Sequence, residues 1–158
     1  MTDMLVKLYN LPPLEPELEE QRGHGITIRR AISPEKHFIK EWVSKYFSEF
    51  WASEVDVAFG HMPISCFLAV EGKQLVGFTC YDTSSKGFFG PVGVWDAGRG
   101  RNTGRALLIQ CLHAMHYEGY GYAIIGAVGP IEFYQKVVGA TVIEDSTPSV
   151  YGGMLRQA

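Results

Sequence analysis

One stretch of the chain, residues 93–108, limits the possible folds more than any other. It reads GVWDAGRGRNTGRALL and overlaps an apolar run at residues 88–95 that is typical of a strand. Its central part is rich in glycine and arginine and has no apolar period, and a helical pattern begins at Ala106. The sequence therefore predicts a strand, a turn and the N-terminus of a helix in direct succession.

The predicted turn has the chemistry of an anion-binding site. The first N–H groups of a helix have no acceptor within the helix, and the helix dipole adds partial positive charge at this end. Three glycines would let a ligand approach the backbone, and three arginines add positive charge. These residues are Gly98, Gly100, Gly104, Arg99, Arg101 and Arg105. We expect the turn to bind a phosphate or pyrophosphate; the alternative is a solvated basic turn without a ligand.

The spacing excludes two common phosphate-binding loops. The dinucleotide-binding pattern G-x-G-x-x-G fails because Thr103 stands where the third glycine is required after Gly98 and Gly100. The P-loop pattern G-x-x-x-x-G-K-[ST] fails because Gly-Lys followed by Ser or Thr occurs nowhere in the chain. The turn therefore belongs to another class of anion site.

The same stretch resembles the acyl-CoA loop of the GNAT N-acetyltransferase superfamily. That loop has the pattern [QR]-x-x-G-x-[GA] after a strand that ends in V-x-V or L-x-V. Residues 92–94 match the strand end, Arg99 matches the first position of the loop and Gly104 matches the last. Asn102 stands where the family normally has glycine, which is compatible with the loop because asparagine tolerates left-handed backbone angles.

A second signature of the family follows later in the chain. The run PIEFYQKVVGA at residues 130–140 resembles the family's apolar-Tyr-x-[KR]-x-x-G-[FA] helix, with Tyr134, Lys136 and Gly139 at the matching positions. The asparagine that often precedes this helix in the family is replaced by Val-Gly-Pro at residues 128–130. The two signatures together extend the resemblance over residues 26–155.

The resemblance implies an α/β (α+β) architecture, the GNAT fold. Its central sheet is mixed, mostly antiparallel and twisted, with about six or seven strands flanked by about four helices, and it is splayed at the acyl-CoA site. Residues 26–158 would form the acetyltransferase domain. Residues 1–25 would form an N-terminal extension, with a strand at 4–9 and a helix at 14–22 packed on the domain; the alternative is a disordered acidic lead.

The apolar pattern along the chain predicts the individual elements. A helical period over residues 34–57 predicts one bent helix or two consecutive ones, and further helices are expected at 106–118 and 130–138. Short apolar runs predict strands at 26–30, 66–71, 74–82, 88–95, 122–128, 141–144 and 150–155. Pro91 between Gly90 and Gly93 predicts a bulge or interruption that leaves backbone groups of the strand free.

The resemblance also implies direct transfer of an acetyl group from acetyl-CoA to a primary amine of a small molecule or peptide. Tyr134 would be the general acid for the leaving thiolate, and backbone N–H groups at residues 93–95 would polarise the carbonyl. The alternative for Tyr134 is a core aromatic with a structural hydrogen bond. The residues expected to bind acetyl-CoA are Val92, Gly93, Val94, Trp95, Arg99, Gly100, Arg101, Asn102, Thr103, Gly104, Arg105 and Tyr134.

The sequence defines the base and the acceptor site less well. Glu71, Asp82 and Asp96 lie at expected strand ends, so each is a candidate base and each is otherwise an ordinary acidic residue of a turn. Tyr46 and Trp51 are candidate acceptor-binding residues because the resemblance implies that the first two helices line the acceptor site. The alternative is that both aromatic side chains pack in the core.

Composition restricts the class of protein. A net charge of -3 over 158 residues argues against a general nucleic-acid-binding protein. No apolar run approaches the roughly 18–20 residues that span a bilayer, and a signal-peptide pattern is missing, so we expect a cytoplasmic protein without a membrane partner. The cysteines lack C-x-x-C spacing, and Cys111 and His113 diverge on a helix, so we expect reduced thiols and no metal.

Two alternative functions remain beside the enzyme. One is a CoA-binding regulatory module without turnover, and the other is an anion- or nucleic-acid-binding domain that uses the arginine-rich turn. A homodimer is a further expectation, because exposed edges of the last strands and of the N-terminal extension would favour pairing with a second copy.

Overall fold

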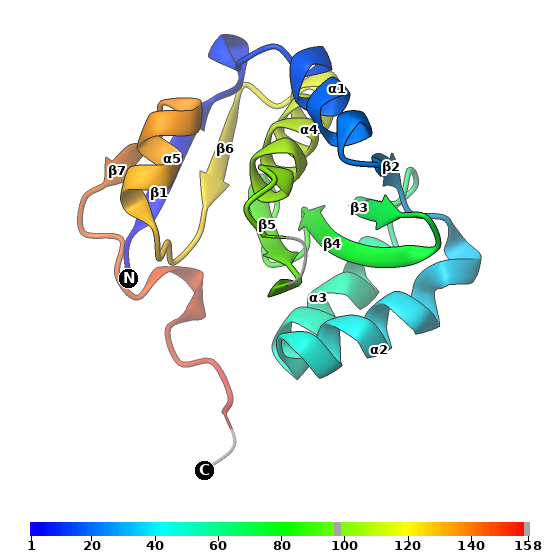
Figure 1. The fold of residues 1–158 in the computed structure, drawn as a ribbon. Helices are drawn as coiled ribbons and strands as arrows, with labels where there is room; N and C mark the ends of the chain where they lie inside the picture. Colours follow the sequence, from blue (N-terminus) through cyan, green and yellow to red (C-terminus); the bar gives the residue numbers. More distant parts are fainter. Residues whose placement is uncertain (97–98, 157–158) are drawn as a thin grey trace.

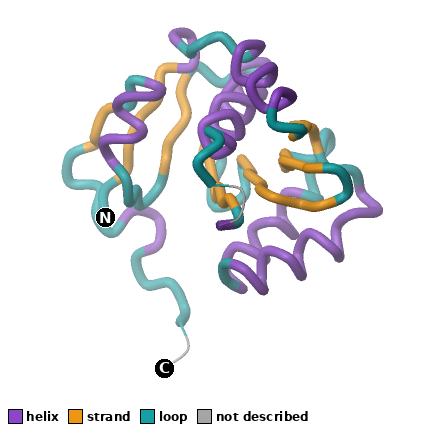
Figure 2. Tube along the Cα trace, viewed as in Figure 1, coloured by secondary structure: helices purple, strands orange, loops and turns teal. Residues whose placement is uncertain are grey.

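The computed structural model describes residues 1–96 and 99–156 (Figures 1 and 2). The strands are β1 (Asp3–Lys7), β2 (Ile26–Arg30), β3 (Cys66–Glu71), β4 (Gln74–Tyr81), β5 (Phe88–Val94), β6 (Tyr122–Ile125) and β7 (Thr141–Ile143). The α-helices of the described residues are α1 (Glu15–Gly23), α2 (Lys36–Tyr46), α3 (Glu49–Ala58), α4 (Thr103–Tyr117) and α5 (Ile131–Val138). The helical pattern predicted from residue 34 onward is thus two helices, with Ser48 capping the second through a hydrogen bond from Trp51 N–H to its Oγ (3.1 Å).

All seven strands form one mixed sheet in the order β2-β3-β4-β5-β6-β1-β7. The β5–β6 pair is parallel and the other neighbours are antiparallel, so the predicted mixed, mostly antiparallel sheet is confirmed. Figure 1 shows the sheet in two halves, with β7, β1 and β6 on the left and β2 to β5 on the right.

The two halves diverge because β5 and β6 are paired at one end only. Their register contains Phe88 opposite Ile124 and Phe89 opposite Ile125, and no further pair among the described residues. On the other side of β5, the register with β4 shifts between Thr79 and Tyr81, so that two residues of β5 lie opposite one residue of β4. This is the predicted bulge, at Gly90 and Pro91, and the sheet splays beyond it.

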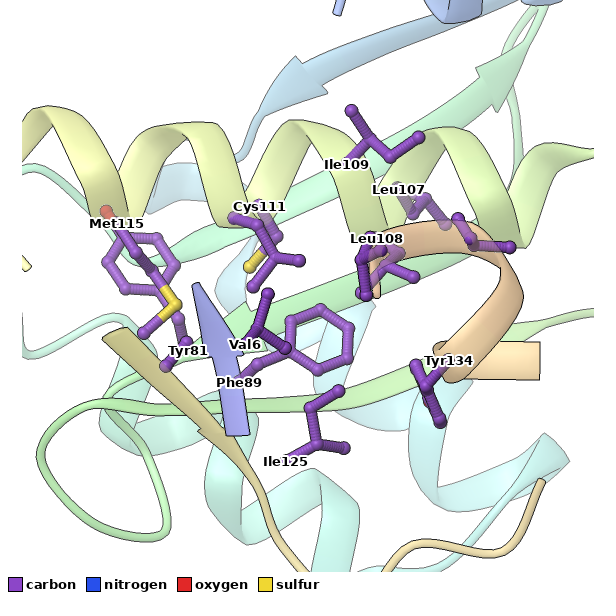
Figure 3. Close-up of a cluster of buried hydrophobic side chains, with 14 of the residues drawn as sticks. Val6, Tyr81, Phe89, Leu107, Leu108, Ile109, Cys111, Met115, Ile125 and Tyr134 are labelled. Atoms are coloured by element: carbon purple, nitrogen blue, oxygen red, sulfur yellow. The ribbon is translucent and has the colours of Figure 1, made fainter. Parts of the chain in front are cut away.

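Helices cover both faces of the sheet. Helices α4 and α5 bury their apolar side chains with β1, β5 and β6 in one core, part of which is drawn in Figure 3. Helices α2 and α3 pack against β3 and β4 in a second core. Helix α1 contacts β2 and α4, so it lies on the α4 side (Figure 1).

The N-terminal strand β1 is an inner strand, between β6 and β7. It pairs with β6 on one side, where Met4 lies opposite Ile125, and with β7 on the other, where Leu5 lies opposite Thr141. Met4 and Val6 are fully buried, and burial of each such side chain contributes roughly 1.5–3 kcal/mol to stability. The N-terminal segment is therefore held in the sheet by its own apolar side chains.

The strand predicted at residues 150–155 is wrong. The structure has a 3-10 turn at Ser149–Tyr151 and then loop, which Figure 2 shows leaving the sheet. Strand β1 lies between β6 and β7, so the C-terminal segment cannot pair with both of them as an inner strand. Gly152 and Gly153 also disfavour an extended ladder, because glycine loses much backbone freedom there and has no side chain to pack.

Candidate functional site

A cleft of about 1440 Å³ opens where β5 and β6 diverge. One wall is formed by Gly90, Val92 and Val94 of β5, and the other by residues 125–130, which end β6 and lead into α5. The turn before α4 closes one end of the cleft, and α3 with the C-terminal segment lines the other. Residues from both halves of the sheet and from the helices around it therefore line the cleft.

The backbone of β5 presents hydrogen-bonding groups to this cleft. Trp95 N–H donates to Val76 O of β4 (2.9 Å), and hydrogen-bonded pairs alternate along an antiparallel ladder. By this alternation the N–H and C=O groups of Val92 and Val94 face away from β4, toward the gap. Of the residues 93–95 expected to polarise a carbonyl, only Val94 therefore has its N–H on the cleft side.

The turn contains a left-handed residue at Asn102, a conformation that asparagine is expected to tolerate there. Asn102 has φ 59° and ψ 23°, which are left-handed angles that asparagine adopts more readily than most other residues with a side chain. Helix α4 begins at Thr103 rather than at Ala106, because Ala106 N–H already donates to Asn102 O (3.0 Å). The N–H groups of residues 103–105 precede the first intrahelical donor, and Gly104 and Arg99 line the cleft. Gly98, expected in the same turn, lies outside the described residues.

Helix α1 fixes this turn from behind. The Gln21 side chain is 1 % exposed; its Nε2 donates to Arg101 O (2.7 Å) and its Oε1 accepts from the Thr103 hydroxyl (2.8 Å). Asn102 Nδ2 donates to Glu20 Oε2 (3.0 Å). The N-terminal segment thereby orients the backbone at the start of α4, which no motif in the sequence indicates.

The arginines of the turn have acidic neighbours. Arg101 pairs with Glu71 of β3 (2.8 Å), and Arg105 pairs with Glu17 of α1 (2.9 Å). The first pair lowers the pKa of Glu71, chiefly through the hydrogen bond from Arg101. Arg99 lies 3.3 Å from Asp96, and both side chains are exposed. Of the three arginines, Arg99 lines the cleft.

Tyr134 lies in the cleft wall formed by α5. Its side chain is 7 % exposed and packs edge-on against Phe89, with ring centroids 6.4 Å apart. Figure 3 shows it at the margin of the buried cluster, on the side of Ile125. Burial raises the pKa of the Tyr134 hydroxyl, which keeps it protonated, and no described residue forms a hydrogen bond with it. The hydroxyl is therefore available to a ligand.

The candidate bases lie elsewhere. Glu71 is engaged with Arg101, as described above. Asp82 closes the turn after β4, accepting from Gly87 N–H at Oδ1 (2.7 Å) and from the Tyr120 hydroxyl at Oδ2 (2.8 Å). Neither carboxylate lines the cleft. The structure therefore does not bring them together with Tyr134.

Of the two aromatic residues predicted to bind the acceptor, one lines the cleft and the other does not. Trp51 lines the cleft from α3, while Tyr46 packs against Trp95 with ring centroids 5.6 Å apart and does not line it. Gly93, expected to contact acetyl-CoA, instead faces α2: a Cβ there would lie 2.7 Å from Phe47 Cζ. Gly93 is thus required for close packing of the second core.

One cleft residue was not recognised in the sequence. Glu54 of α3 lines the cleft, and its carboxylate accepts a hydrogen bond from the Ser84 hydroxyl. The signal that could have found it is helical spacing, because positions 50, 51 and 54 share one helix face. An acidic residue on a face with Phe50 and Trp51 indicates a ligand-facing position better than a core one.

No protein-family model and no curated protein matches the sequence. Solved structures do match. A GCN5-related N-acetyltransferase from Sphaerobacter thermophilus is 25 % identical with a TM-score of 0.69, over 90 % of this chain and 48 % of that one. A GNAT family acetyltransferase from Brucella melitensis, in complex with acetyl-CoA, is 19 % identical with a TM-score of 0.57, over 76 % of this chain and 88 % of that one.

A third structure contains a much longer chain. It is described as a GCN5-related glucosamine N-acetyltransferase region in a fungal multi-domain GH3 β-N-acetylglucosaminidase, and it is 13 % identical with a TM-score of 0.74 over 90 % of this chain. Our chain spans 19 % of that protein and 48 % of the Sphaerobacter protein. These likenesses confirm the predicted architecture: the chain has the GNAT fold.

Proposed function

We propose that this chain, which has the GNAT fold, transfers an acetyl group from acetyl-CoA directly to a primary amine. The observation that carries the proposal is the cleft at the splay. It joins the free backbone edge of β5, the N-terminus of α4 and the Tyr134 hydroxyl in one continuous space. Each of these three parts suits a different part of an acyl-CoA molecule.

The edge of β5 suits the pantetheine arm. This arm is extended and carries two amide groups, so it can hydrogen-bond to Val92 and Val94 as an added strand would. The gap between β5 and β6 supplies the space. The pairing of β5 with β6 ends just before the bulge at Gly90 and Pro91, which leaves this gap open.

The turn before α4 suits the pyrophosphate. The N–H groups of residues 103–105 and the helix dipole favour an anion at Gly104. Arg99, whose exposed side chain also lies near Asp96, supplies a side-chain cation at the cleft; Arg101 and Arg105 pair with Glu71 and Glu17 and do not line it. Backbone donors therefore contribute more to anion binding here than the number of arginines indicates.

Tyr134 suits the leaving thiolate. The thiolate needs a proton donor as the C–S bond breaks, and the Tyr134 hydroxyl is protonated at neutral pH and has no hydrogen-bond partner among the described residues. Val94 N–H on the cleft side is a donor for the carbonyl oxygen as negative charge develops. These groups support acyl transfer by direct attack, without a covalent enzyme intermediate.

Amine-dependent release of CoA tests the proposal. Acetyl-CoA is incubated with a panel of primary amines, and free thiol is measured with and without each amine. We expect release that depends on amine. Binding of acetyl-CoA without amine-dependent release would instead support the CoA-binding module without turnover.

Gly104→Val tests the position of the cofactor. A Cβ at Gly104 meets only Val94 Cγ2 among atoms within 4 Å, at 3.6 Å, so the variant can fold while its side chain fills the anion site. We expect calorimetry to show loss of acetyl-CoA binding. Gly23→Val, at the exposed end of α1, is the matched control and should bind as the wild type does. Retained affinity in Gly104→Val would contradict the assignment.

A further inference from the structure

The end of the cleft opposite the α4 turn contains a chain of hydrogen bonds that the proposed acyl transfer does not use. The Tyr151 hydroxyl donates to Ser84 Oγ (3.1 Å), and the Ser84 hydroxyl donates to Glu54 Oε1. The three residues come from the 3-10 turn Ser149–Tyr151, the loop between β4 and β5, and α3. All three line the cleft.

Glu54 is a half-buried carboxylate without a counter-ion. It is the only acidic residue among the described residues that line the cleft, and no described lysine, arginine or histidine forms an ion pair with it. Burial raises its pKa, although hydrogen bonds from Ser84 and Thr83 lower it in part. A carboxylate held in this way is costly unless a cation compensates it, and the open side of the cleft lets a ligand supply that cation.

Large apolar side chains lie beside the hydrogen-bonded group of Glu54, Ser84 and Tyr151. Phe50 and Trp51 lie on the same helix face and line the cleft, and Phe50 is half exposed. Pro148 and Met154 line the cleft from the C-terminal segment. Apolar and aromatic side chains beside a single carboxylate suit a ligand with one cationic group on an apolar or aromatic body.

We infer that this end of the cleft binds the acyl acceptor, and that the acceptor is a primary ammonium on an apolar or aromatic body, with its nitrogen at Glu54. A polyamine would leave further ammonium groups without carboxylates, and an amino sugar would leave the apolar faces of Phe50 and Met154 without an apolar ligand surface. The inference rests on the proposed transfer for its chemistry, but the binding of the amine can be measured without turnover.

In the reaction Glu54 is the catalytic base. The ammonium group gives one proton to Glu54, and the nitrogen lone pair forms the C–N bond with the thioester carbonyl carbon. The C–S bond breaks, and the departing thiolate takes the proton of Tyr134. The nitrogen then gives its second proton to the Tyr134 oxygen, and Glu54 releases its proton to solvent. The products are the N-acetyl amine and CoA thiol.

Calorimetric titration of phenethylamine into the protein saturated with CoA tests the site. The variant is Glu54→Gln, which keeps the shape and removes the charge. A charge-assisted hydrogen bond is worth roughly 1.5–3 kcal/mol, so we expect at least about 10-fold weaker binding of phenethylamine. Glu49→Gln carries the same change at an exposed position of the same helix and should bind as the wild type does. Glu54→Asp keeps the charge and should retain binding.

The outcomes separate this inference from the proposed function. No binding of phenethylamine by the wild type, binding by Glu54→Gln within about threefold of the wild type, or tighter binding of spermidine or glucosamine would each overturn the inference. In the thiol-release assay, a general base contributes typically 100-fold or more, so we expect a loss of about 100-fold in kcat for Glu54→Gln with acetyl-CoA affinity unchanged. Binding that depends on Glu54, but without CoA release from any amine, would support the amine site and refute the transferase.

Discussion

Gln21 gives the sharpest test of how the N-terminal segment supports the site. Its side chain donates to Arg101 O and accepts from Thr103 Oγ1, behind the turn that opens α4. Gln21→Leu keeps the size of the side chain and removes both hydrogen bonds. It leaves two polar atoms of the turn without their partners, inside a well-packed contact between α1 and α4.

The expected loss follows from the burial of those two atoms. A buried polar group without a partner costs roughly 1–3 kcal/mol. Thr103 is 2 % exposed, so its hydroxyl would be left buried without a partner. Arg101 is only partly buried, so water can replace Gln21 at its carbonyl. We therefore expect the free energy of unfolding to fall by about 2–4 kcal/mol. Urea unfolding measures it, with an unchanged slope and a lower midpoint.

The control and the double variant decide whether the reasoning holds. Gln135→Leu makes the same change at an exposed position of α5 and should shift stability by less than about 0.5 kcal/mol. Gln21→Leu with Thr103→Val removes both members of one buried pair, so we expect the double variant to lose less than the sum of the single losses. A loss below about 0.5 kcal/mol for Gln21→Leu, or strict additivity, would refute the argument.

Three further variants test other parts of the molecule. Tyr134→Phe should lower kcat with unchanged affinity for acetyl-CoA in calorimetry, while Tyr117→Phe at an exposed position of α4 should alter neither; unaltered turnover in the first would reject the donor role. Gly93→Ala should destabilise the fold by roughly 1–3 kcal/mol in urea unfolding, because its Cβ would lie 2.7 Å from Phe47 Cζ; a neutral effect would contradict this packing. Glu54→Gln should raise the thermal midpoint at pH 7 but not at pH 4. Burial raises the pKa of Glu54 in the folded state, so wild-type stability falls as pH rises from the pKa of the unfolded state to that of the folded state. An equal difference between variant and wild type at both pH values would contradict the burial of the charge.

The sequence predicts two strands at one side of the sheet and the bulge in β5 well, and the reason is physical. Strands β2 and β3 are found with the predicted bounds because alternation and apolar runs report burial directly. The bulge at Gly90 and Pro91 is confirmed because proline lacks an N–H and interrupts a ladder whatever the tertiary context. Local chemistry of this kind needs no knowledge of distant contacts.

The errors arise where distant segments compete for one place. Residues 150–155 have a strand-like pattern, but β1 from the other end of the chain already lies between β6 and β7. The contacts of Arg101 with Glu71 and of Thr103 with Gln21 join residues that are far apart in the sequence, so no local pattern reveals them. Glu54 is a different case: its helical spacing with Phe50 and Trp51 is a local signal, but the prediction of candidate bases covers only carboxylates at strand ends.

The position of β1 also has a consequence for the acceptor end of the cleft. Because β1 fills the inner place beside β6, the C-terminal segment does not enter the sheet, and Tyr151 and Met154 line the cleft instead. Tyr151 reaches Glu54 through Ser84, so the last part of the chain helps to orient the carboxylate that we assign to the amine. The N-terminal segment thus supports the anion end of the cleft directly, through Gln21, and leaves the C-terminal segment free to form the acceptor end.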